Sequence, residues 1–122
     1  MNPASPAAFA LVMLGGALGS ALRYGAGLVS VAWFGAAYPW STFAVNVVGS
    51  ALIGVAAGLG VEGGWRLLVV TGFLGGFTTF SAFSLETATL WERAPWLAAT
   101  YVAGSVGLGL AAFVLARRLV AG

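Results

Sequence analysis

The chain of 122 residues contains no cysteine, histidine, lysine or aspartate. Without cysteine and histidine there is no disulfide framework, no thiolate nucleophile, no imidazole base and little means of holding a transition metal. Charged residues make up only 7% of the chain, as five arginines and three glutamates. The arginines do not cluster on a polar face, so the sequence predicts no nucleic-acid partner. With no nucleophile–base pair or metal cluster to assemble, we expect a protein that is not an enzyme.

Hydrophobic residues, by contrast, make up 61% of the chain, far more than the polar surface of a small soluble domain could cover. Four segments have the length of about 20 apolar residues that crosses a bilayer: approximately 7–30, 40–61, 66–90 and 95–118. We therefore predict an all-α membrane protein with four transmembrane helices in a single transmembrane domain, 1–122. The five tryptophans lie at or next to the breaks between these segments, where indole rings prefer the headgroup region: Trp33, Trp40, Trp65, Trp91 and Trp96.

The arginines give a weak orientation signal. With four spans, both termini and the second loop share one side of the membrane, which holds Arg66, Arg117 and Arg118. The other side holds Arg93 and also Arg23, if Arg23 snorkels to the interface from the end of the first helix as we expect. Three arginines against one or two is a small bias, so the chain is compatible with insertion in either orientation.

Small residues are dense, with 19 glycines, and several glycines stand four apart so that they share a helix face. Close packing within one bundle explains any single pair, and packing between subunits is the alternative. Because four short helices enclose little volume, a pathway through this protein would need more than one copy. The pairs are Gly15 and Gly19, Gly54 and Gly58, and Gly72 and Gly76.

In the second helix, Thr42, Asn46 and Ser50 follow one another at intervals of four and form a polar stripe on one face. Asn46 is close to mid-span, where an amide is costly unless it has partners in the protein or in a wet cavity. One interpretation is an interhelical hydrogen bond that holds the bundle together. The stripe extends over two turns, which favours the other interpretation, a lined pathway.

The segment GFLGGFTTFSAF, residues 72–83, interrupts the third apolar stretch with glycines and hydroxyls. Gly75 and Gly76 weaken a helix, and Thr78 and Thr79 can offer hydroxyls to a disturbed backbone. A simple kink would explain a lone Gly-Gly pair. Freed backbone groups in a membrane survive only where they are buried, bind an ion or line water, so the two threonines favour ion binding at a helix break.

Beyond this break, Phe80 and Phe83 are three residues apart and point to one side. Such spacing usually means core packing, but the positive ring edges can also favour an anion. Glu86 lies inside the apolar span; it is either a functional carboxylate or the partner of an arginine near the interface. Ser81 lies within the same stretch, and Ser105 lies near the middle of the fourth helix. Donors, aromatic edges and few acidic groups favour a small anion over a cation.

Three motifs, GGALGSALRY (15–24), STFAVNVVGSALIG (41–54) and GFLGGFTTFSAFSLE (72–86), together resemble the Fluc/CrcB family of fluoride channels. The family patterns read approximately GGxxGAxxRY, GTxxVNxxGS and GFxGGxTTFSTFSxE. The resemblance implies a fluoride-selective channel, multi-pass in the cell inner (plasma) membrane, that exports fluoride passively and lowers its cytoplasmic concentration. It also implies an antiparallel, dual-topology homodimer in the lipid bilayer, with a structural sodium ion at the dimer centre.

Residue by residue, the resemblance assigns a fluoride pathway and a sodium site. The sodium ligands would be the backbone carbonyls of Gly75 and Thr78. The implied pathway residues are Arg23, Thr42, Asn46, Thr79, Phe80, Ser81, Phe83, Glu86 and Ser105.

Two positions depart from the family pattern. Ser41 replaces a glycine, and Ala82 replaces a threonine, which removes one hydroxyl from the polar track. With Ser81 and Thr79 in place, we expect conduction to survive.

Other functions and assemblies are also compatible with the sequence. A coupled exporter resembling the small multidrug transporters would need a carboxylate in the first span, which has only Arg23. A scaffold subunit without transport would need only close glycine packing, and it leaves the polar stripe unexplained. A heterodimer with a paralogous chain is also compatible with the sequence, although the nearly balanced arginines favour a homodimer.

Overall fold

The computed structural model describes residues 2–122, and four stretches of it are long and apolar enough to cross a membrane. They are α1 (Pro6–Phe34), α2 (Trp40–Leu59), a composite third span (Gly63–Arg93) and α6 (Pro95–Ala121). The prediction of four transmembrane helices is confirmed.

The ends of these helices follow from local sequence signals. Ser5 caps α1 by accepting a hydrogen bond from the backbone N–H of Ala8 at 3.1 Å, with proline in the first turn. α2 ends at Gly60, which adopts the left-handed conformation (φ 68°) that glycine accepts without steric cost. Pro95 begins α6 directly after α5 ends, so the last two helices are joined by a sharp corner.

The third span consists of several helical pieces. A short turn, α3, leads into the π-helix η1 and the short α4; after two extended residues the chain continues as α5. The extended residues are Thr78 (φ −87°, ψ 156°) and Thr79 (φ −152°, ψ 124°). This confirms the predicted break in the third helix. The bounds are α3 Gly63–Trp65, η1 Arg66–Leu74, α4 Gly75–Phe77 and α5 Phe80–Arg93.

The prediction that Gly75 and Gly76 disturb the helix is wrong in position. Gly75 is helical (φ −62°, ψ −36°), and Gly76 lies within α4. Gly76 is instead needed for close approach, because a Cβ there would lie 2.6 Å from the carbonyl oxygen of Gly16. The break therefore follows the glycines and falls on the two threonines.

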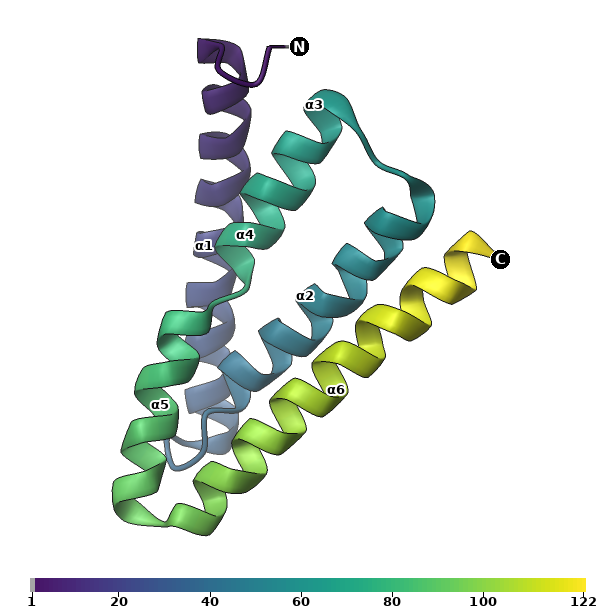
Figure 1. Ribbon diagram of the computed structural model, residues 1–122. Coiled ribbons are helices and arrows are strands. Elements are labelled where there is room, and N and C mark those ends of the chain that lie inside the picture. The colour runs from purple at the N-terminus through teal and green to yellow at the C-terminus, as the bar shows by residue number, and fades with distance from the viewer. Residues whose placement is uncertain (1) are drawn as a thin grey trace.

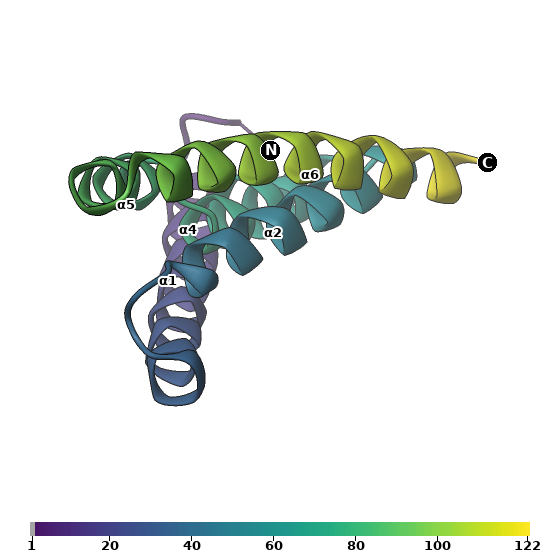
Figure 2. The ribbon, with the colours of Figure 1, turned by 90° about the horizontal axis from the view of Figure 1, so that it is seen from below.

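The helices pack in pairs. α2 and α6 lie side by side over much of their length, while η1 and α4 lean against α1, and α5 packs against the first half of α6 (Figure 1). Seen from below, α6 lies on one side of α2 and α1 on the other (Figure 2). The third span thus packs on α1 before its break and on α6 after it, and the break itself lies next to α2.

The glycine pairs bring these helices together within the chain. A Cβ on Gly15 would lie 2.1 Å from the carbonyl oxygen of Leu68, and one on Gly19 would lie 2.0 Å from that of Phe73. On α2, a Cβ at Gly54 would lie 2.5 Å from the Phe113 carbonyl oxygen. Of the two explanations offered by the sequence, these glycines support packing within one bundle.

Substituting Gly15 by alanine should lower the free energy of unfolding by about 1–3 kcal/mol, because backbone atoms of η1 would have to move away from the new methyl group. Thermal unfolding of the detergent-solubilised protein measures this. Gly107 is the matched control, since a Cβ there meets nothing within 4 Å in the chain. Equal effects of alanine at the two positions would contradict the packing assigned to Gly15.

Candidate ion pathway

A groove of about 410 Å³ lies between α2, the broken third span and α6. It brings together residues that are distant in sequence, and no charged side chain is among those that line it. Its polar lining residues come from all three spans: Asn46, Ser50, Thr78, Thr79 and Ser105. Phe80 and Phe83 add two aromatic rings from the start of α5.

The side chain of Asn46 pairs with the backbone at the helix break. Its Oδ1 accepts from the N–H of Thr79 at 2.8 Å, and its Nδ2 donates to the carbonyl oxygen of Thr79 at 3.0 Å. In a continuous helix the Thr79 N–H would donate to the carbonyl of Gly75. The amide of Asn46 thus takes the donor away from Gly75 and fixes its own orientation. The interhelical hydrogen bond is therefore present, and Asn46 also lines the groove.

The carbonyls of Leu74, at the end of η1, and of Gly76, in α4, have different hydrogen-bond partners. That of Leu74 accepts from both the N–H (3.0 Å) and the hydroxyl (2.8 Å) of Thr78. That of Gly76 accepts from Nε of Arg23 at 3.1 Å. The expectation that Arg23 snorkels from the end of the first helix is wrong: α1 continues to Phe34, and Arg23 is a partly buried donor to the break.

Thr79 also caps α5. Its Oγ1 accepts from the N–H of Ala82 at 3.1 Å, and it lies 3.3 Å from Oγ of Ser81. Ala82 therefore contributes to the cap through its backbone, which a missing side-chain hydroxyl does not affect. Ser81 reaches the groove only through Thr79, since it is exposed and is not itself among the lining residues.

The carboxylate of Glu86 accepts from two hydroxyls. Thr42 donates to Oε1 at 2.8 Å and Tyr101 donates to Oε2 at 3.0 Å. Within residues 2–122, Glu86 has these hydroxyl partners and no arginine. Tyr101, fully buried, was not among the predicted pathway residues. Its spacing of four from Ser105 on one face of α6 is the sequence signal that could have identified it.

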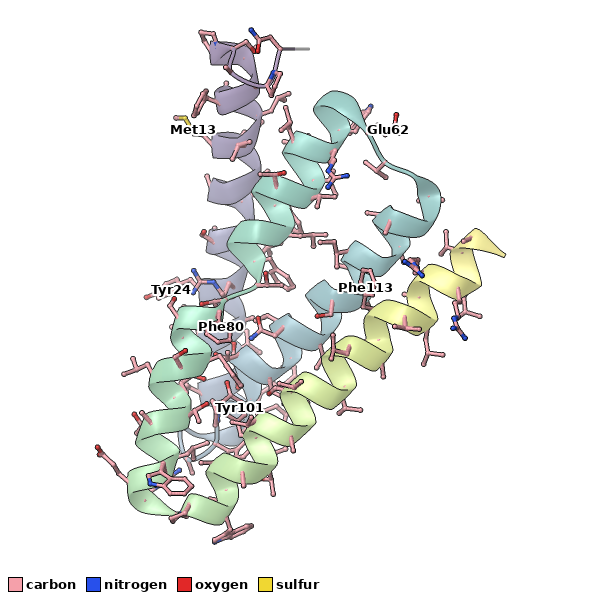
Figure 3. All side chains as sticks on the ribbon, viewed as in Figure 1. Met13, Tyr24, Glu62, Phe80, Tyr101 and Phe113 are labelled. Carbon is pink, nitrogen blue, oxygen red and sulfur yellow. The ribbon has the colours of Figure 1, made fainter. Side chains whose placement is uncertain are left out.

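The two phenylalanines differ in environment. Their ring centroids lie 5.7 Å apart, and Phe83 packs on Tyr101 at 5.1 Å. Phe80 is 79% exposed, so it is not a core residue of this chain. Figure 3 shows Phe80 beside the break and Tyr101 further along, between α5 and α6. The hydroxyl oxygen of Ser105 is buried at the groove and has no hydrogen-bond partner within residues 2–122.

Four membrane-crossing helices and an uncharged polar groove beside a capped helix break define a small multi-pass membrane protein of the channel class. A family model described as "CrcB-like protein, Camphor Resistance (CrcB)" matches residues 10–117, and the chain belongs to this family. The family membership that the three sequence motifs predicted is therefore confirmed.

Three relatives from bacteria are each named "Fluoride-specific ion channel FluC". The protein of Erythrobacter litoralis is 51% identical over 84% of this chain and 84% of its own length. That of Rhizobium etli is 53% identical over 85% of this chain and 88% of its own. That of Novosphingobium aromaticivorans is 51% identical over 94% of this chain and 97% of its own.

Replacing Asn46 by leucine should destabilise the protein, because the N–H and carbonyl of Thr79 lose their side-chain partners inside the membrane. We expect a loss of about 1–3 kcal/mol for each backbone group left unpaired. Thermal unfolding in detergent measures it. Ser50→Ala is the control one turn along the same face, where no hydrogen bond within residues 2–122 is lost; a similar loss in both variants would refute the role of Asn46.

Proposed function

We propose that this chain is a fluoride-selective channel, multi-pass in the plasma membrane, that exports fluoride passively and lowers its cytoplasmic concentration. The observation that carries the proposal is the uncharged groove at the break, lined by N–H and O–H donors and by the rings of Phe80 and Phe83. Relatives more than half identical to the chain are named fluoride-specific channels, which supports the same ion.

The donors suit a small, strongly hydrated anion. Nδ2 of Asn46 carries two N–H groups and uses one on Thr79, so the other remains for an ion in the groove. The buried hydroxyl of Ser105 has no partner among residues 2–122 and is free to donate. Closely spaced donors can replace the hydration shell of fluoride, because hydrogen bonds to an anion are short and strong.

The aromatic rings and Arg23 favour the same sign of charge. The positive edges of Phe80 and Phe83 can face an anion that passes between them. Arg23 donates to the Gly76 carbonyl just before the break, and the positive charge of its guanidinium favours an anion in the neighbouring groove. Further along, Thr42 and Glu86 continue the polar track, and the carboxylate holds the hydroxyls of Thr42 and Tyr101 in fixed positions.

The pathway is completed by a second copy in an antiparallel, dual-topology homodimer. One chain leaves Phe80 79% exposed at the groove, which calls for a partner surface in the same place. The glycine pairs are used inside the chain, so they no longer support this interface. The weak arginine bias supports insertion of the two copies in opposite orientations.

A sodium ion at the dimer centre fits the carbonyls at the break. Gly75 loses its helical donor because the Thr79 N–H turns to Asn46, and the extended Thr78 leaves its own carbonyl outside any helix. Carbonyl oxygens are suitable ligands for a hard cation. Gly75 and Thr78 would hold the ion, which would supply a fixed positive charge where two chains meet.

Purified protein in liposomes tests the function. With a potassium ionophore present and a fluoride electrode outside, we expect rapid fluoride release and no chloride release. Retention of fluoride by liposomes that contain the folded protein would contradict the proposal.

Phe80→Ile and Phe83→Ile should each reduce fluoride efflux by up to about tenfold, because isoleucine fills the space without a positive ring edge. Efflux from the same liposomes measures the effect. Leu85→Ile, on an exposed position of the same helix, is the control. Normal efflux with both rings replaced would remove their assigned role.

Replacing sodium by N-methylglucamine should lower the unfolding temperature, because an ion bound only by the folded dimer stabilises it by about 2.7 kcal/mol at a hundredfold excess over its dissociation constant. Asn46→Leu should abolish this sodium effect by disturbing the break, whereas Ser50→Ala should keep it. An unfolding temperature that does not depend on sodium in the wild-type protein would contradict the site.

A further inference from the structure

A second hollow, of about 460 Å³, lies between the α1–α2 loop and the later part of α5. Glu86 is in its wall, together with Ala37 from the loop and Arg93 from the end of α5. Glu86, whose carboxylate accepts hydrogen bonds from the hydroxyls of Thr42 and Tyr101, therefore also lines this hollow.

Arg93 closes this hollow on one side. Its guanidinium donates from Nη2 to the carbonyl oxygen of Ala37, across 56 positions of sequence. A third hollow, which includes Tyr38 and Leu97, is also lined by both Ala37 and Arg93. The hydrogen bond between Arg93 and Ala37 therefore lies between the two hollows.

The backbone hydrogen bonds of loop residues 35–39 do not reach α5 or α6. They run from the N–H of Gly35 to the carbonyl of Val31, from the N–H of Trp40 to that of Tyr38 and from the N–H of Phe43 to that of Pro39. The hydrogen bond from Arg93 to Ala37 therefore links this loop to α5. Gly35 also has a positive φ of 76°, which lets the chain turn sharply away from α1.

Next to Ala37, the loop contacts the polar track through an aromatic pair. The ring of Tyr38 packs edge-on against Tyr101, with centroids 5.7 Å apart and planes at 84°. Tyr101 in turn donates its hydroxyl to Glu86. One line of contacts therefore runs from Arg93 through the loop to the carboxylate in the membrane.

We infer that Arg93 is a positioning residue for the ion pathway: it fastens residues 35–39 to the end of α5, which keeps Tyr38 on Tyr101 and the Tyr101 hydroxyl on Glu86. This inference rests on the proposed function. Its effect is transmitted through the loop and does not require an ion to touch Arg93.

The test is a double-mutant cycle of Arg93→Ala with Tyr101→Phe, which removes only the hydroxyl. Arg93→Ala should lower fluoride efflux by about tenfold, and the double variant should conduct no worse than Tyr101→Phe alone, because both changes act on one interaction. Arg93→Lys, which keeps a donor and the charge, should recover most of the efflux. Arg118→Ala, an exposed arginine at the C-terminal end, should leave efflux unchanged.

Unchanged efflux in Arg93→Ala, or effects that multiply in the double variant, would overturn the inference. A difference in efflux between the wild-type protein and Arg93→Ala that disappears at high salt would also overturn it, since it would indicate long-range attraction of anions. Should Arg93→Ala fail to fold, Arg93→Gln takes its place in the cycle.

The same cycle measured by thermal unfolding separates this inference from the proposed function. If the wild-type protein carries no fluoride, the function fails, yet coupling between positions 93 and 101 in unfolding temperature would still support the contact line. Additive shifts in unfolding temperature would overturn it irrespective of the ion.

Discussion

The pairing of the Asn46 side chain with the backbone of Thr79 is the interaction on which the rest of the pathway depends. Inside a bilayer a helix can break only if its freed N–H and carbonyl groups are satisfied by protein, an ion or water. The side-chain amide of Asn46 accepts from the N–H of Thr79 at 2.8 Å and donates to the carbonyl of the same residue at 3.0 Å. The polar groove exists because this pairing makes an extended segment tolerable at that depth.

Close helix packing makes that pairing possible. α4 approaches α1 so closely that a Cβ at Gly76 would lie 2.6 Å from the carbonyl of Gly16, and Gly49 on α2 leaves room for the methyl group of Thr78, which a Cβ there would meet at 2.2 Å. Arg23 then completes the arrangement by donating to the Gly76 carbonyl. Small residues and the partly buried Arg23 thus hold the third span where its break faces α2.

The four spans and the existence of a break follow from the sequence, because apolar length and the run of glycines and threonines are local signals. The position of the break does not, since Gly76 has low helix propensity but is held in a helix by packing against α1. Tyr101 was missed because its partner, Glu86, lies on another helix and no local pattern joins them. Arg23 was placed at a helix end because its partner, the Gly76 carbonyl, lies on another span, 53 positions away. Contacts between distant segments account for all three differences.

The most direct measurement of the central claim is fluoride efflux through Asn46→Asp in liposomes, compared with its folding in detergent. Aspartate keeps an oxygen to accept from the Thr79 N–H, so the break is retained on that side. Neither the ionised nor the protonated carboxyl has the second N–H that Asn46 offers to the groove. The account predicts a folded protein with fluoride efflux lost. Efflux equal to that of the wild-type protein would show that fluoride does not pass at the amide of Asn46 and would contradict the account.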